Sequence, residues 1–159
     1  MQYPPKTGGI PRTSCGLEGY RGHMRRAISL VTIADLDYNS SDKNRVSVSA
    51  RLGLLLESGN SLLLLDDRGF STTQRWSEAT VDEIKADALS VVGPDDALED
   101  QSEEEAAEEY WEYLSEILEQ QDFDIEPAGL RELPHEVRLS QRLIKRLNAA
   151  TPQQGGRTP

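Results

Sequence analysis

The chain has 159 residues, of which 36% are hydrophobic, and its 17 Lys and Arg against 28 Asp and Glu give a net charge of −11. This length can build one hydrophobic core and is too short for two ordinary domains. The negative charge disfavours a nucleic-acid backbone or an anionic membrane surface as the partner.

Two further features of composition indicate where the protein works. No apolar run approaches the length of a membrane-spanning helix, and the single cysteine, Cys15, cannot form an intramolecular disulfide. We therefore expect a cytoplasmic protein.

Thirteen of the seventeen basic residues are Arg, a usage that favours a bacterial, GC-rich coding sequence.

Both ends of the chain have a composition that predicts disorder. Residues 1–23 are rich in Pro and Gly and poor in apolar side chains, so burial cannot offset the entropy lost on ordering. Residues 151–159 are similar. Met24 opens the patterned part of the chain, which predicts a translation start there in place of Met1, and one domain over residues 24–150. The intact mass of the native protein would decide between the two starts.

Alternating polarity and β-branched residues predict the first strands. Residues 26–33 form one, and residues 46–56 form a longer one with a single buried face. The run Ser58-Gly59-Asn60 then predicts a tight hairpin turn into a third strand at residues 61–65.

The hairpin turn would set the pairing of its two strands. If Ser58 pairs with Ser61, Leu56 lies opposite Leu63, and both faces of the hairpin are apolar. Helices could cover both faces there, or one face could remain exposed and serve in association. The residues of that exposed face would be Leu55, Leu62 and Leu64.

Residues 66–69, with the sequence Asp-Asp-Arg-Gly, should end or bulge the third strand, and residues 70–76 are predicted to continue as a further extended segment. A helix follows. Thr80 and Glu83 match a capping box, and Gly93-Pro94 is a typical helix end.

The stretch from Asp95 to Asp124 contains fourteen Asp and Glu and neither Lys nor Arg. Ser102 and Glu105 match a second capping box, so a helix should begin here, with its first-turn acid favoured by the helix dipole. Apolar residues at helical spacing form one stripe, and the glutamates lie on the other faces. The stripe consists of Ala107, Tyr110, Trp111, Leu114, Ile117 and Leu118.

A last helix is predicted after a turn-rich connection at residues 127–133. Pro134 suits its first position, and its apolar spacing extends to about Asn148. Its remaining side chains are largely basic. We therefore expect this helix to lie antiparallel to the acidic helix, with the apolar stripes contributing most of the docking energy.

Three or four strands followed by about three helices predict an α+β fold. The sheet is expected to be small and antiparallel, built as a meander, with the helices packed mainly on one of its faces. The short connections are consistent with a single compact domain.

Asp66 and Asp67, followed by Arg68, form the most site-like cluster. Paired carboxylates could hold a divalent cation or share a proton, as a small metal-assisted hydrolase would require. In the alternative, Arg68 pairs with one Asp and Gly69 takes a positive φ in an ordinary turn. We favour the turn and predict no metal site, because the sequence identifies no further ligands.

A second oxygen-rich run, Asp35 to Asn39, imitates the opening of a calcium loop. The match fails further on, because Ser40 replaces the required Gly and Val46 replaces the bidentate Glu. The run predicts an ordinary polar loop.

The histidines and glycines exclude several kinds of catalytic site. His23 and His135 are the only histidines, so a three-His zinc site is excluded, and no Gly-x-Ser-x-Gly turn is present to hold a nucleophile for a triad. The glycines match neither a phosphate-binding loop nor a dinucleotide fingerprint. We predict no catalytic residue and no cofactor, and we interpret His135 as a packed or solvent-facing residue at a helix start.

Aromatic residues in the acidic helix differ in their expected roles. Tyr110 and Trp111 lie on the apolar stripe and should belong to the core. Tyr113 lies off the stripe among glutamates and, with Trp76, is predicted to be an exposed anchor in an interface. The predicted partner-binding residues are Glu108, Glu109, Glu112, Tyr113 and Trp76.

The leading hypothesis is a non-enzymatic protein that presents the carboxylates of residues 95–124 to a basic protein partner. By analogy of fold alone, an immunity or inhibitor protein acting on a cationic toxin or nuclease would fit. Two alternatives are a metal-assisted hydrolase using Asp66 and Asp67, and a structural subunit that forms a homodimer through the leucine face of the hairpin. A further explanation is that the acid only keeps the protein soluble.

Overall fold

The computed structural model describes residues 26–38 and 44–150. The expectations for residues 1–23, for a start at Met24 and for residues 151–159 fall outside this part of the chain. So do the positions of Cys15 and His23, and most of the loop after Asp37.

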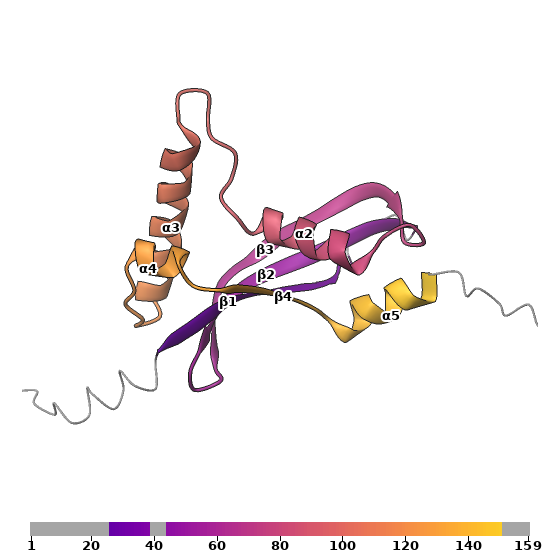
Figure 1. Cartoon of the computed structure of the whole chain (residues 1–159), viewed down its shortest axis with the longest axis horizontal. Helices are drawn as coiled ribbons and strands as arrows, with labels where there is room; N and C mark the ends of the chain where they lie inside the picture. Colours follow the sequence, from indigo (N-terminus) through magenta and orange to yellow (C-terminus); the bar gives the residue numbers. More distant parts are fainter. Residues whose placement is uncertain (1–25, 39–43, 151–159) are drawn as a thin grey trace, which may run out of the picture.

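A mixed, mostly antiparallel sheet of four strands forms the centre of the fold (Figure 1). Its order is β3-β2-β1-β4, in which β1, β2 and β3 are an antiparallel meander and β4 pairs in parallel with β1. The predicted α+β fold is therefore confirmed. The strands are β1 (Ala27–Leu36), β2 (Arg45–Leu56), β3 (Ser61–Arg75) and β4 (His135–Leu139).

Within residues 26–38 and 44–150, four helices accompany the sheet, and the two capping boxes are formed as the sequence predicts. The Oγ1 of Thr80 accepts the N–H of Glu83 at 3.3 Å, and the Oγ of Ser102 accepts the N–H of Glu105 at 3.2 Å. Each Glu carboxylate reaches back to its cap residue. The helices are α2 (Val81–Val91), α3 (Glu103–Glu119), α4 (Pro127–Arg131) and α5 (Gln141–Ala150).

Strand β4 occupies residues that the sequence pattern assigned to the last helix, and that assignment was wrong. Residues 135–139 alternate between half-buried and exposed positions, and they pair with β1 from Leu30 to Ala34. The edge of β1 has backbone N–H and C=O groups that need hydrogen-bond partners. A neighbouring strand supplies these partners, whereas a helix, whose backbone groups bond to one another, does not. The helix begins only after Ser140, whose Oγ accepts the N–H of Leu143 at 3.1 Å.

The acidic and basic helices are not the antiparallel neighbours that the sequence suggested. Helix α3 packs against α4 and β3, whereas α5 packs against β1, and Figure 1 shows them at opposite ends of the molecule. The short helix α4 takes the position beside α3, with Leu130 completely buried. Strand β4 then carries the chain along the sheet to α5.

The hairpin between β2 and β3 has a different register from the predicted one. Leu55 pairs with Ser61, and Leu54 with Leu62, because the turn is longer than two residues. The N–H of Leu56 donates to the C=O of Asn60 at 2.9 Å, and Gly59 has a φ of 89°. These are features of a three-residue hairpin loop with a left-handed last residue.

The corrected register changes the predicted leucine face. Leu64 is buried, while Leu55 and Leu62 are half-buried. Leu63 is instead 48% exposed and shares the outer face of the sheet with Ile33, which is 41% exposed. The proposed association surface therefore cannot include Leu64.

Strand β3 is one long strand whose pairing with β2 shifts register at three places, where the sequence suggested two segments. At one of them Leu65 pairs with Leu52 and Arg68 with Ala50, so a bulge at Asp66–Asp67 contains one extra residue. Gly69 follows this bulge, at a point where the backbones of β3 and β2 lie close together. A Cβ at this position would lie 2.7 Å from the carbonyl oxygen of Val48, so the position favours glycine.

The core lies between the inner face of the sheet and the helices. Helix α2 contacts all four strands, and α3 reaches the hairpin end, where Gln121 donates to the C=O of Leu63 at 2.8 Å. Leu30, Leu52 and Leu114 are among the completely enclosed side chains. Among the helices that the structure describes, none combines the length and apolarity needed to cross a membrane.

Asp35 connects the end of β1 to the start of α5. The sequence placed it in a polar loop, but it belongs to β1 and is 8% exposed. Its carboxylate accepts from the N–H of Leu36 at 2.8 Å, from the Oγ of Ser140 at 2.5 Å and from Arg142. Burial alone would raise the pKa of Asp35, but these hydrogen bonds outweigh burial and lower the pKa.

The Asp35→Asn variant should therefore lose stability in a pH-dependent way. Because the folded-state pKa is depressed, the contribution of the carboxylate is present above the unfolded pKa of about 3.9 and is lost as the pH falls through the folded value. We expect a loss of about 1–3 kcal/mol at neutral pH that disappears in strong acid. Thermal unfolding of both proteins across this pH range measures it. Asp66→Asn, at an exposed position, is the control, and a loss independent of pH would contradict the interpretation.

Candidate functional site

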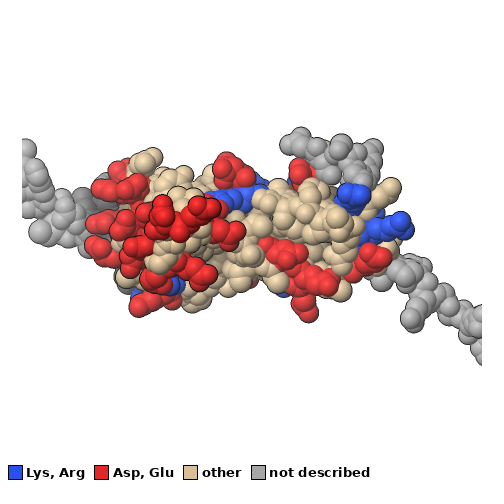
Figure 2. Space-filling model, turned by 90° about the horizontal axis from the view of Figure 1, so that it is seen from above, with Lys and Arg blue, Asp and Glu red and all other residues tan. Residues whose placement is uncertain are grey.

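The acidic stretch Asp95–Asp124 forms a continuous exposed surface, which we call the acidic surface. All fourteen of its Asp and Glu are exposed. Figure 2 shows Asp and Glu gathered most densely over the end of the molecule that carries α3, whereas the end that carries α5 shows Lys and Arg together with further Asp and Glu. The densest acid therefore lies at one end of the molecule.

Helix α3 is oriented by its apolar stripe, which confirms the predicted pattern. Tyr110, Leu114 and Leu118 are buried, and Trp111 and Ile117 pack against the core at its edge. Because the stripe is directed inward, the glutamates at the intervening positions are directed to solvent. The first-turn glutamates stabilise the helix start through the dipole.

Tyr110 ties α3 to the end of α2. Its hydroxyl donates to the C=O of Val92, and its ring meets that of Trp111 edge to face, with centroids 5.0 Å apart. Burial raises the pKa of Tyr110 to about 12, so the phenol stays a donor throughout the physiological range. The prediction of a core role for Tyr110 is confirmed, and Trp111 is half-buried beside it.

Two arginines from elsewhere in the chain pair with the acidic surface. Arg68 binds Asp95 through both guanidinium nitrogens, at 2.5 and 3.2 Å, and Arg131 binds Glu104 at 2.8 Å. The hydrogen bond from Arg68 lowers the pKa of Asp95. These pairs hold the start of the acidic stretch to β3 and the first turn of α3 to α4, so part of the acid is neutralised inside the fold.

The predicted partner-binding glutamates take no direct part in these two ion pairs, although Glu108 lies one turn from Glu104 and helps to raise the pKa of Arg131. Glu108, Glu109 and Glu112 are exposed, and Tyr113 is 52% exposed beside them. The structure thus brings four of the five predicted residues onto one helix. Whether they bind a partner remains a prediction.

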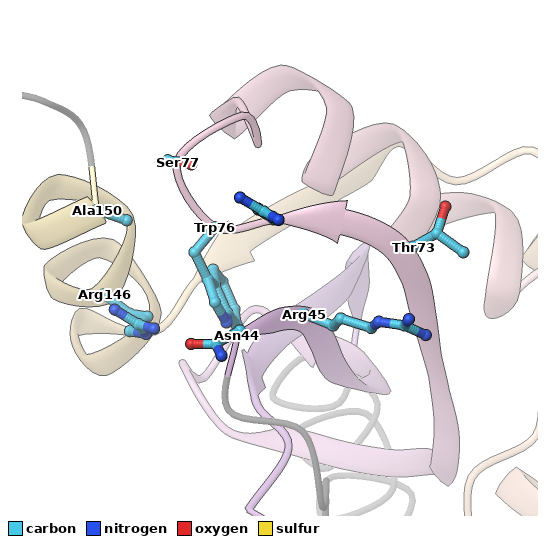
Figure 3. Close-up of a pocket in the computed structure, with 8 residues that line it drawn as sticks. Asn44, Arg45, Thr73, Trp76, Ser77, Arg146 and Ala150 are labelled. Atoms are coloured by element: carbon cyan, nitrogen blue, oxygen red, sulfur yellow. The ribbon is translucent and has the colours of Figure 1, made fainter.

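Trp76 does not belong to this surface, and its predicted exposure was wrong. It is only 6% exposed and lies at the end of β3, with the guanidinium of Arg146 5.3 Å from its ring centroid. Helix α5 covers it, because α5 packs at the opposite end of the sheet from α3 (Figure 1). No local pattern predicts this contact (Figure 3), which joins residues seventy positions apart.

Two hollows border the loop before α3, and the sequence analysis did not identify them. One, of about 600 Å³, is lined by Leu98, Glu105 and Glu109, among others. The other, of about 470 Å³, lies between Asp95 and Glu103. Leu98 is 75% exposed, so the first hollow combines carboxylates with an accessible apolar side chain. A lone Leu within an acidic loop is the signal that could have found it.

Asp66 and Asp67 were considered for metal chemistry, which requires further ligands beside them. Asp66 and Asp67 are exposed in the bulge of β3. Within residues 26–38 and 44–150, no group of three or more His, Cys, Asp or Glu could hold a metal ion. The hydrolase alternative stays untested.

His135 begins β4 and is half-buried, where the sequence predicted a helix start. Its Nε2 lies 2.7 Å from the Oγ1 of Thr32, which is completely buried. Burial lowers the pKa of His135, so the neutral ring that this hydrogen bond accommodates is favoured.

The chain matches no protein-family model, no curated protein and no solved structure.

The acidic surface should reduce stability through repulsion along α3. Glu112 has glutamates at the helical neighbour positions 108, 109 and 116, and like charges at such spacings destabilise a helix. Glu112→Gln should therefore raise the Tm by about 1 °C at low salt. Salt near 1 M should abolish the gain by screening. Thermal unfolding measures both effects; Glu57→Gln, in the hairpin turn, is the control, and a lowered Tm would contradict the repulsion.

Proposed function

We propose that this chain is a non-enzymatic cytoplasmic binding protein whose acidic surface binds a basic protein partner. The observation that carries the proposal is the exposure of all fourteen carboxylates of Asp95–Asp124 at one end of the molecule. The fold could have neutralised them by docking the basic helix α5 against α3. Instead, α5 packs at the other end.

The hollow beside Leu98 suggests how a basic side chain would be bound. A Lys or Arg from the partner could lay its hydrocarbon stem along Leu98 while its charged group meets Glu105 or Glu109. Tyr113, half-exposed on the same helix, would add apolar contact area. Contact area and charge would then act together within a few helical turns.

The field of the acidic surface would act mainly on the speed and selectivity of association. Concentrated charge accelerates encounter with an oppositely charged partner and excludes partners of like charge. An immunity or inhibitor protein that blocks a cationic toxin or nuclease is one biological setting in which such behaviour is useful. This setting rests on analogy alone.

The proposal is tested by charge reversal on α3. The triple variant Glu108→Lys, Glu109→Lys and Glu112→Lys should slow association with a partner isolated from the native host at least tenfold at low salt. The wild-type association rate should fall steeply as salt rises, because screening removes the steering. Stopped-flow or surface-based kinetics measure both quantities.

A matched control distinguishes the effect of the acidic surface on the association rate from the effect of net charge. The triple variant Glu57→Lys, Asp66→Lys and Asp87→Lys changes net charge equally at exposed positions outside the acidic stretch. When both triple variants are compared at about 0.1 M salt, its association rate should stay within about threefold of wild type, since charges more than about 10 Å from the contact are then largely screened. Equal slowing by both triple variants, or a complex insensitive to salt, would refute the proposal.

A second candidate function is self-association through the outer face of the sheet. Ile33 and Leu63 are exposed there, and register places half-buried Leu55 on the same face. Light scattering over a concentration series would show a dimer that Leu63→Ser converts to monomer. A monomeric wild-type protein at all concentrations would exclude this candidate.

A further inference from the structure

Strand β4 forms one edge of the sheet, and its pairing is regular. The sheet order is β3-β2-β1-β4, so among the strands that the structure describes β4 pairs with β1 alone. The register runs without a shift from His135, opposite Leu30, to Leu139, opposite Ala34. A regular edge strand offers its unpaired backbone groups to any strand that approaches it.

The open edge of β4 has backbone groups at alternate residues. The N–H of Leu30 donates to the C=O of Pro134 at 2.8 Å, and the N–H of Ser140 donates to the C=O of Ala34 at 2.9 Å. Backbone groups alternate between the two edges of a strand, so the even-numbered residues of 134–140 face β1. The backbone groups that face away from the sheet belong to His135, Val137 and Leu139. No hydrogen bond from another described residue reaches these backbone groups.

The other edge of the sheet, on β3, is protected against such pairing. The register of β3 with β2 shifts at three places, and Gln121 of α3 donates to the C=O of Leu63 at 2.8 Å. Bulges and covering side chains are common devices that keep an edge strand from pairing with another chain. Strand β4 is therefore the edge that is suited to a further strand.

The charged side chains of β4 are arranged in a self-complementary order. Glu136 and Arg138 are exposed, and they pair with each other through two hydrogen bonds of 2.9 and 2.8 Å. An antiparallel copy of the strand, centred on Val137, places Glu136 of each copy opposite Arg138 of the other. Opposite charges directly across an antiparallel pair are stabilising.

The same register also aligns the backbone. It sets Val137 opposite Val137 of the second copy, and His135 opposite Leu139. These are the residues whose backbone groups face the edge, and residues paired in this way exchange two hydrogen bonds. A shift by one residue would misalign these groups. A shift by two residues would realign them, but would set Glu136 or Arg138 opposite itself, and like charges there are destabilising.

We propose that two copies of this chain pair through β4, antiparallel and about a two-fold axis at Val137, so that their sheets join into one. The charge order of β4 selects this partner, because an unrelated strand could satisfy the backbone without matching Glu136 and Arg138. The same patch on both copies is the usual arrangement in homodimers. The inference goes beyond the proposed function, because no residue of the acidic surface takes part.

Charge exchange on β4 tests the pairing. Sedimentation equilibrium of the full chain at low salt should show a dimer of the wild-type protein, with measurements up to millimolar concentration because a five-residue strand makes a small interface. Glu136→Arg and Arg138→Glu should each weaken the dimer about tenfold, since each sets like charges opposite each other. An equimolar mixture of the two variants should form a heterodimer about as stable as the wild-type dimer, which a variant that had lost its fold could not do.

Two control variants separate β4 from the outer face of the sheet. Arg51→Glu is the matched control for Arg138→Glu, because both arginines are exposed and both lie opposite Ile33 on neighbouring strands. It should dimerise as the wild-type protein does. Leu63→Ser should also leave the dimer intact.

Cysteine cross-linking tests the register in a Cys15→Ser background. Directly opposite residues have Cα atoms about 4.5–5.5 Å apart, within the range of a disulfide. A mixture of Glu136→Cys and Arg138→Cys proteins should therefore form disulfide-linked heterodimers under mild oxidation, detected by intact mass. Either variant alone should cross-link at least tenfold more slowly, because its two cysteines are offset by two residues, about 7 Å along the strand.

The proposal is overturned by a wild-type protein that stays monomeric at millimolar concentration, by a mixture of Glu136→Arg and Arg138→Glu that does not recover the dimer, or by Glu136→Cys cross-linking as fast alone as in the mixture. Loss of the dimer in Leu63→Ser or Arg51→Glu, with the β4 variants unaffected, would assign the association to the outer face of the sheet instead.

Discussion

The parallel pairing of β4 with β1 decides where the charged helices lie. After α4 the chain could have formed a continuous basic helix against α3, as its apolar spacing allows. Instead, residues 135–139 fill the free edge of β1, and their backbone groups gain partners that solvent would otherwise supply. The strand runs along the sheet and delivers α5 to the opposite end, where the ion pair of Arg142 with Asp35 secures it.

This path separates the acidic helix from the basic helix. At one end, α3 presents its glutamates to solvent, and at the other, α5 carries Arg142, Lys145 and Arg146. Repulsion among the glutamates opposes folding by a modest amount, and the buried core that α2 and α3 complete with the sheet outweighs it.

Features encoded within a few residues could be predicted from the sequence. The capping boxes at Thr80 and Ser102 and the apolar stripe of α3 depend on local spacing, and the structure has them as predicted. Features that depend on contacts between residues far apart in the chain could not be predicted in this way. The strand at His135 needs the edge of β1, and the burial of Trp76 needs α5. The predicted hairpin register was wrong because it assumed a two-residue turn. In the structure the turn has three residues and ends in the left-handed Gly59.

The separation of the two charged helices can be measured directly. Nitroxide labels at Tyr113→Cys on α3 and Asn148→Cys on α5, in a Cys15→Ser background, place one label on each exposed helix face. Double electron–electron resonance should then give a distance corresponding to opposite ends of the molecule. A short distance, as expected for two packed helices whose axes lie about 8–10 Å apart, would contradict the pairing of β4 with β1. It would also contradict the separation of α5 from the acidic surface, which depends on that pairing.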